Sequence, residues 1–294
     1  MSDLQTLLVG FGAWAGFFVL IGLASNFYHA ARSRRGVAGP VPDYGLRARV
    51  KRLAKPTLLL VPAKIAGFSK IGGRPELPPG LSWPVGPDGA LTFVAQIDID
   101  AFHRYGGFDW LPNFGRLYLF FDATRNGARD CGRVLYSREF PDAAPAWPDD
   151  LPGRSRFEER RVAFMRFASL PSPDWIEDAT LYTLVDWEDW PFAQDLDLGD
   201  EIEHRIGGYP TEIQSSQMAI DCEYLWRGLM RDYGQPVPPK LKHAARQWRL
   251  LMQIDSDPAL GMEWWDAGRL YVFIRARDAK RGDFSKTVTL TQTH

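Results

Sequence analysis

The sequence predicts an α+β fold: a β-rich duplicated domain of two related units, preceded by one transmembrane helix. Three observations support this prediction. An uncharged apolar run lies near the N-terminus, three short blocks recur in the same order in the two halves, and these blocks alternate apolar and polar residues as strands do. With 45% hydrophobic and 24% charged residues among 294, the composition is that of an ordinary globular protein.

We divide the chain into an anchor, a linker and a domain of two repeat units joined by an acidic connecting segment. The boundaries are 1–30 for the transmembrane anchor, 31–55 for the basic linker and 56–294 for the domain, with repeat units at about 56–140 and 200–294 and the connecting segment at about 141–199.

Residues 7–27 predict a membrane span. The run has no charged side chain, and as a helix it would measure about 31 Å, close to the thickness of a bilayer's hydrocarbon core. A cleaved signal peptide is the competing interpretation, but it needs a basic start and a shorter apolar run. The arginines within 32–35 indicate a single-pass protein of a bacterial inner membrane with its domain on the cytoplasmic side. The lipid bilayer is therefore a predicted partner, and the spacing of Gly12 and Gly16 allows a homodimer through this helix.

The charge changes sign along the chain. Residues 32–55 carry eight Lys or Arg and one acid, as expected of a linker near anionic headgroups. Between Phe167 and Glu203 there are 11 acids and no Lys or Arg. This stretch lacks the spacing of a calcium loop, so a solvated acidic face that meets a basic partner is the better interpretation.

The composition argues against several classes of site. A net charge of −1 indicates no nucleic-acid partner. Cys131 and Cys222 lie far apart and have no Cys or His at metal-ligand spacing. The glycine pairs form neither a phosphate loop nor a dinucleotide fingerprint. We therefore predict no metal and no cofactor.

Three collinear blocks define the repeat. "KIGGRPELP" at 70–78 matches "RIGGYPTEI" at 205–213, "FVAQIDID" at 93–100 matches "LLMQIDSD" at 250–257, and "FGRLYLFFD" at 114–122 matches "AGRLYVFIR" at 267–275. Because the order is the same in both halves, we expect two versions of one β-rich unit packed together.

The repeated strands carry the candidate site. Apolar residues occupy alternate positions from Phe93 to Ile99, so each unit places one glutamine and one aspartate on the opposite face. If the "GRLY" strands are neighbours, each aspartate can meet an arginine. Either these residues are satisfied polar pairs that set strand register, or they line a ligand cleft between the units. The candidate binding residues are Gln96, Asp98, Arg116, His204, Gln214, Gln253, Asp255 and Arg269.

The shared Ile-Gly-Gly-x-Pro sequence predicts a turn that needs positive φ or close backbone packing. His204 precedes the second copy, where the first copy has Ser69. A catalytic histidine needs a nucleophile or a metal set, and the histidines of this sequence are scattered, so we assign no catalytic residue. Gln214 opens a polar stretch that could contact a partner or cap a helix. The turn residues are Gly72, Gly73, Pro75, Gly207, Gly208 and Pro210.

Few helices are predicted. Residues 238–248 form a helical run that begins at prolines, and 221–230 could form another. Mixed helix and strand order favours an α+β fold over a doubly wound sheet.

Taken together, the blocks resemble the bacterial YwqG-like family, a domain of unknown function. The resemblance rests on "SKIGGRPELPPGLSWP", "LTFVAQIDID", "GRLYLFF", "HRIGGYPTEIQ" and "WRLLMQIDSD" and extends from about Pro56 to His294. It implies a compact, duplicated α+β domain and no catalytic residues. The apolar run and the basic linker lie outside the family pattern.

We expect a non-catalytic protein-binding or regulatory module at the cytoplasmic membrane face. The alternative is a small-ligand binder or hydrolytic enzyme that uses a polar cleft between the two repeat units. Geometry separates them, because a ligand site needs the candidate residues to converge on one concave pocket.

Overall fold

The computed structural model describes residues 49, 52–63, 67–122, 131–139, 144–171, 202–214 and 217–294. The membrane span predicted at 7–27 lies outside these residues. A search of the described part of the chain found no helix with the length and hydrophobicity that crossing a bilayer requires.

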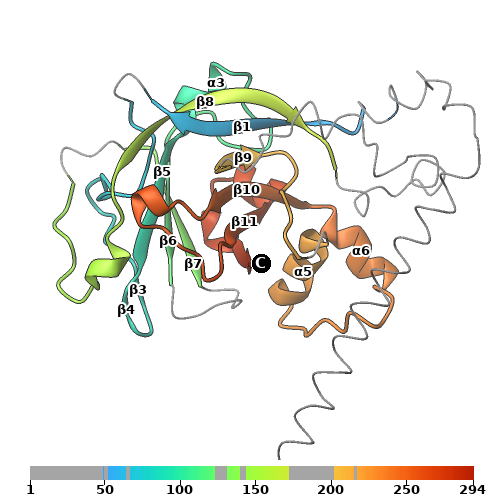
Figure 1. Cartoon of the computed structure of the whole chain (residues 1–294). Coiled ribbons are helices and arrows are strands. Elements are labelled where there is room, and N and C mark those ends of the chain that lie inside the picture. The colour runs from blue at the N-terminus through green and yellow to red at the C-terminus, as the bar shows by residue number, and fades with distance from the viewer. Residues whose placement is uncertain are drawn as a thin grey trace, which may run out of the picture. The chain divides into compact units, whose positions relative to one another are not determined.

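Ten antiparallel strands form one sheet, in the order β12-β11-β10-β9-β1-β8-β2-β5-β6-β7 (Figure 1). A separate hairpin consists of β3 (Val85–Gly86) and β4 (Gly89–Ala90). The strands of the large sheet are β1 (Lys55–Pro62), β2 (Lys70–Ile71), β5 (Thr92–Asp98), β6 (Arg116–Phe121), β7 (Gly132–Ser137), β8 (Arg160–Ser169), β9 (Arg205–Gly207), β10 (Trp248–Asp255), β11 (Arg269–Arg275) and β12 (Val288–Gln292).

The strand order shows an exchange between the two halves. From the middle of the sheet outward, β2-β5-β6-β7 repeats as β9-β10-β11-β12. However, β1 precedes β2 in the chain and pairs with β9, while β8 precedes β9 and pairs with β2. The two exchanged strands pair with each other over eight residue positions and join the halves into one sheet.

The sheet curls until its two edge strands approach each other. Gly132 of β7 lies so close to β12 that a Cβ atom there would overlap Thr289. The Cys131 Sγ lies 3.9 Å from the Thr289 carbonyl oxygen, and the rings of Tyr136 and Phe284 are 5.1 Å apart. The result is a nearly closed barrel, in which side-chain packing rather than a strand ladder joins the edges.

The inner face of this barrel holds the main core, with apolar side chains from both halves. A β-bulge lies between Phe93 and Ala95 in β5, and another lies at the equivalent place between Leu250 and Met252 in β10. A bulge shifts the alternation by one residue, so Phe93 and Leu250 pack outside the barrel, in separate clusters. The strict alternation predicted from Phe93 onward is therefore wrong at its first residue.

The helices are short and lie at the periphery (Figure 1). Gly228, with φ of 66°, follows the end of α5, and Pro238 and Pro239 begin α6, so neither run extends beyond three turns. The helices are α3 (Ile99–His103), α5 (Met218–Trp226), α6 (Pro239–Ala245) and α7 (Ala276–Lys280), with single 3₁₀ turns η1 (Gly153–Ser155), η3 (Pro258–Leu260) and η4 (Phe284–Lys286).

For the described part of the chain, the predicted α+β fold of two units packed together is wrong. The described residues instead form one β-rich, barrel-like sheet with few helices. The physical reason is the strand exchange: β8 lies within 141–199, which was expected to be only a connecting segment, and it completes a sheet that both halves share.

Candidate functional site

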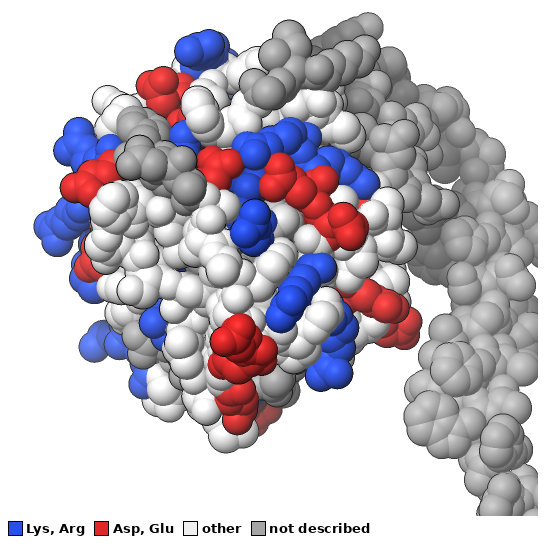
Figure 2. All heavy atoms as spheres, turned by 90° about the vertical axis from the view of Figure 1, so that its left-hand side faces the viewer, with Lys and Arg blue, Asp and Glu red and all other residues white. Residues whose placement is uncertain are grey.

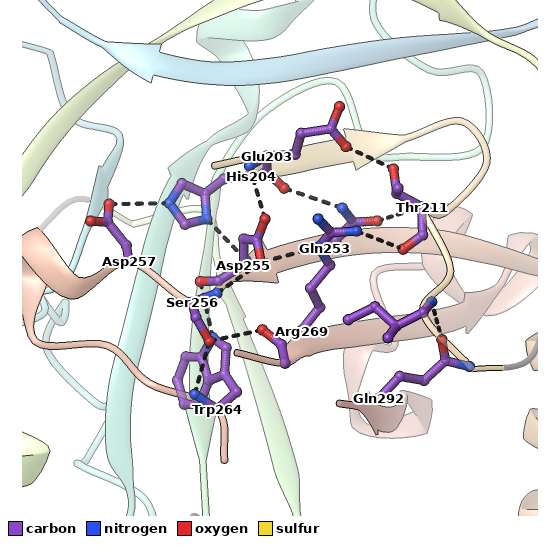
Figure 3. Close-up of polar contacts among 12 residues, drawn as sticks. Glu203, His204, Thr211, Gln253, Asp255, Ser256, Asp257, Trp264, Arg269 and Gln292 are labelled. Carbon is purple, nitrogen blue, oxygen red and sulfur yellow. Dashed lines mark hydrogen bonds and ion pairs between the residues drawn. The ribbon is translucent and has the colours of Figure 1, made fainter. Parts of the chain in front are cut away.

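In the second half, Gln253 holds the segment before and after the Ile-Gly-Gly turn (Figure 3). Its Oε1 accepts a hydrogen bond of 2.8 Å from the Thr211 amide, and its Nε2 donates to the Glu203 carbonyl at 3.2 Å. The Tyr271 hydroxyl donates to the Thr211 carbonyl at 2.6 Å. Gln253 is fully buried, so its polar atoms are used inside the protein.

The first half repeats this arrangement with equivalent residues. Gln96 Oε1 accepts from the Glu76 amide at 2.8 Å, and its Nε2 donates to the Phe68 carbonyl at 2.8 Å. The Tyr118 hydroxyl donates to the Glu76 carbonyl at 2.8 Å. In each half, the same three hydrogen bonds from one glutamine and one tyrosine side chain therefore hold the turn segment.

His204 occupies the place that Ser69 takes in the first half. Its Nδ1 accepts from the Asp255 amide at 3.1 Å, as the Ser69 Oγ accepts from the Asp98 amide at 3.0 Å. Because Nδ1 accepts, the ring proton is on Nε2. The histidine thus replaces a serine that performs the same backbone contact, and this contact requires no catalytic role.

The other nitrogen of His204 faces a buried carboxylate. Its Nε2 lies 3.5 Å from Asp257, which also forms an ion pair with Arg160 of β8. Burial raises the pKa of Asp257, but the His204 hydrogen bond and the charge of Arg160 outweigh it and hold the pKa below its usual value. This triad links the exchanged strand β8 to the loop after β10.

The predicted aspartate–arginine pairs lie opposite each other in the sheet. Asp255 faces Arg269 and forms an ion pair of 3.0 Å with it. Asp98 faces Arg116 in the same way, but Arg116 lies 3.5 Å from Glu76. Burial raises the pKa of Asp98, although the positive charge of Arg116 opposes this effect.

A charged cluster absent from the predicted set surrounds Glu76. Its carboxylate lies 3.0 Å from Arg161 and 3.6 Å from Lys70, which also bonds Glu159 at 2.9 Å. Burial raises the pKa of Glu76, but the hydrogen bond from Gln96 and the two cations more than offset it and lower the pKa. The cluster joins the first turn to β8.

The structure thus brings the candidate residues together in two separate sets. Gln96, Asp98 and Arg116 lie in the first half, and the second set lies on the far side of β2, β8, β1 and β9. Gln214 is exposed and lies 3.4 Å from Thr293. The second set consists of His204, Gln253, Asp255 and Arg269.

The Ile-Gly-Gly turns are close-packed in both halves. All four glycines have φ between 67° and 73°. A Cβ at Gly72 would overlap the Glu158 carbonyl, and one at Gly207 would overlap the Phe108 ring. Each turn therefore has backbone geometry and space that suit only glycine. The prolines that follow, Pro75 and Pro210, are buried.

Sequence reasoning missed several partners of these networks. Tyr118 and Tyr271 occupy equivalent repeat positions, and that equivalence was a signal for a shared contact. Glu76 and Asp257 gave no such signal, because each pairs with an arginine of β8, Arg161 or Arg160, and β8 was not predicted as a strand.

The polar side chains of these networks bond mainly to backbone groups and to each other. Within the described residues, no group of three or more His, Cys, Asp or Glu side chains could hold a metal ion. The face shown in Figure 2 carries acidic and basic side chains intermingled, without a continuous area of one charge. The described polar residues are thus arranged to anchor turns and strands.

Fold and site together define a β-rich, barrel-like protein with two equivalent polar networks that brace its turns. A family described as a domain of unknown function (DUF1963) matches residues 69–292, and the chain belongs to this family. A comparison with curated proteins found no match.

Proposed function

We propose that the chain is a YwqG-like protein that acts as a non-catalytic protein-binding module. The collinear sequence blocks support the YwqG-like assignment within its family. The candidate residues of the two polar networks are mostly buried and bonded within their own halves, which argues against one shared ligand cleft. A partner would then be met by another surface.

The main support for this proposal is the group of exposed apolar side chains on the loop between α5 and α6. Met230 is 96% exposed, Tyr233 is 69% exposed and Leu229 is 46% exposed. Large apolar side chains grouped in solvent are a common mark of an interaction site.

Polar contacts hold this loop in its exposed position. Arg231 pairs with Asp221 at 2.6 Å and bonds Gln217, and its guanidinium lies 4.4 Å from the centre of the Tyr233 ring. The Tyr233 hydroxyl also lies 3.2 Å from Asp221. A loop ordered before binding loses less conformational entropy on association, which favours affinity.

The charges around the loop indicate the chemistry of the partner. Arg227 is about half exposed, and exposed bases continue along α6 and its end, while Asp232 is the exposed acid nearby. We therefore expect a protein partner with an apolar pocket for Met230 and an acidic rim. The bases of α6 are Lys240, Lys242 and Arg246.

Site-specific photocrosslinking tests the proposal. A photoreactive residue in place of Met230 should capture a discrete protein in cells, whereas the same residue at exposed Glu263 should not. The purified partner should bind the Met230→Ser, Tyr233→Ser double variant at least about tenfold more weakly, as for a binding hot spot.

The controls separate binding from folding. Because Met230 is almost fully exposed, Met230→Ser should leave the free energy of unfolding unchanged within about 0.5 kcal/mol. Capture of lipid or of a second copy of the chain, or unchanged affinity of the double variant, would contradict the proposal.

A further inference from the structure

A pocket of about 380 Å³ lies where the two halves of the barrel meet. The loop after α3, residues 106–110, and the start of β1 with Lys55 line it from the first half. Gly208 and Arg249 complete it from the second half. None of the eight candidate binding residues lines this pocket, so it is a separate feature. Its volume lies within the roughly 300–1,000 Å³ of small-molecule sites.

Two cations line the pocket, against one acid, the exposed Asp109. The ammonium of Lys55 lies 3.9 Å from the centre of the Tyr209 ring. The guanidinium of Arg249 is fixed by hydrogen bonds of 2.6 and 3.0 Å to the carbonyl oxygens of Arg246 and Trp248. Both charges are thus held beside the same cavity, which gives it a positive potential.

The ionisation of Lys55 supports this picture. Burial and, as the smaller cause, repulsion from Arg249 together lower the pKa of Lys55 to about 8. An anion bound beside the two cations would relieve that repulsion.

The remaining walls suit a flat apolar group. Phe108 and Trp110 lie with their ring centres 5.3 Å apart, and both line the pocket. Gly106 and Gly107 also line the pocket, and a Cβ atom at either position would overlap the side chain of Arg166 or His103. The lining therefore combines two cations with an aromatic surface.

We propose that this pocket binds a small organic anion, a carboxylate or a phosphate ester, with Lys55 and Arg249 contacting the charged group and Trp110 contacting the apolar part. This site is independent of the α5–α6 loop, so either proposal can fail without the other.

Calorimetric titration of the full chain with benzoate and phenyl phosphate at pH 7 tests the site. At least one probe should bind saturably, with a Kd of about 1 mM or lower. Lys55→Gln and Arg249→Gln should each weaken binding by about tenfold, the effect of one charge-assisted contact. Benzyl alcohol, which has the ring without the charge, should not bind.

Matched variants keep the test decisive. Lys280→Gln removes an exposed cation on α7 and should leave the affinity unchanged. Trp110→Ala should weaken both aromatic probes and leave the thermal unfolding profile cooperative. Absence of saturable binding by both anions, equal binding of benzyl alcohol, or full affinity in the two charge variants would each overturn the proposal.

A pH series gives a second readout. Among the described residues, the charged or titratable groups around Lys55 include Arg249, Tyr209 and Asp109, with Arg166 beside Gly106 and His103 beside Gly107. Benzoate stays ionised from pH 7 to 9.5, so loss of the Lys55 proton near pH 8 should weaken its binding by several-fold. Lys55→Arg, which keeps its charge, should remove this pH dependence; an unchanged dependence would contradict the role of Lys55.

Discussion

At the scale of single residues, the repeat preserves contacts more closely than residue types. Ser69 and His204 have different chemistry, yet each accepts a hydrogen bond from the amide of the aspartate two residues after the repeated glutamine. Gln96 and Gln253 keep both type and contacts. At each of these positions the polar side chain forms a hydrogen bond with a backbone group, as most side-chain hydrogen bonds within proteins do.

Gln253→Leu should lower the free energy of unfolding by about 3 kcal/mol, because it leaves the Thr211 amide and the Glu203 carbonyl without their partner. Urea unfolding measures the loss. Gln247→Leu, at an exposed position after α6, is the matched control and should cost less than about 0.5 kcal/mol. A variant Gln253→Leu of full stability would favour a ligand-binding role for this residue instead.

Asp257→Asn should destabilise the protein by about 2 kcal/mol at pH 7, because it removes the negative charge that pairs with Arg160 and that faces His204 Nε2. The folded pKa of Asp257 is lowered, so its stabilisation is present above the unfolded value near 3.9 and is lost as the pH falls through the folded pKa. The difference between wild type and variant should therefore shrink toward pH 3.

Urea unfolding at pH 7 and pH 3 gives both differences directly. Asp266→Asn, at an exposed position, should show little effect at either pH. An Asp257→Asn effect of the same size at both pH values would rule out the charged pairing as its origin.

At the scale of elements, the sequence predicted β5, β6, β10 and β11, the strands of the matching blocks, and missed the other strands of the sheet. The "FVAQIDID" and "GRLYLFF" blocks lie on β5 and β6, because alternation and β-branched or aromatic residues are local signals. β8 was not predicted: it follows a charged start and lies beside a long acidic stretch, and its pairing with β1 and β2 depends on distant residues. The bulges in β5 and β10 were also not predicted, because the alternation of apolar and polar residues does not indicate an extra residue.

The Ile-Gly-Gly turns allow a test that separates backbone strain from packing. Gly72→Ala should cost more than about 2 kcal/mol, because the residue has positive φ and a Cβ would overlap the Glu158 carbonyl. Gly228→Ala has similar φ but open space, so it should cost only about 1 kcal/mol. Gly153→Ala has neither constraint and should be nearly neutral.

Thermal and urea unfolding of the three variants give this order. Equal costs for Gly72→Ala and Gly228→Ala would show that positive φ alone explains the glycine in the turn. The sequence identified the glycine pair, but only the structure distinguishes strain from crowding.

At the scale of the whole molecule, strand exchange explains why the candidate polar residues of the two halves do not share a cleft. Because β1 pairs with β9 and β8 with β2, each half contributes its first strand to the other, and the inner faces of both halves form one apolar core. The sequence repeat indicated two units, but no local pattern reports which copy a strand joins. The polar residues consequently face outward, into separate networks, instead of toward each other.

Closure of this barrel depends on the close contact between β7 and β12, and Gly132→Ala should disturb it. The added methyl group would overlap Thr289, so the edges must separate, at a cost of about 1–3 kcal/mol. Cys131 lies beside this seam and is buried, whereas Cys222 is a buried residue of α5, in the apolar cluster outside the barrel. A thiol reagent should therefore modify Cys131 faster in the variant than in wild type, while Cys222 stays protected in both.

Gly153→Ala is the control and should leave both thiols protected. Equal acceleration at both cysteines would indicate global unfolding, and protection of Cys131 in Gly132→Ala would show that the barrel closes without this contact.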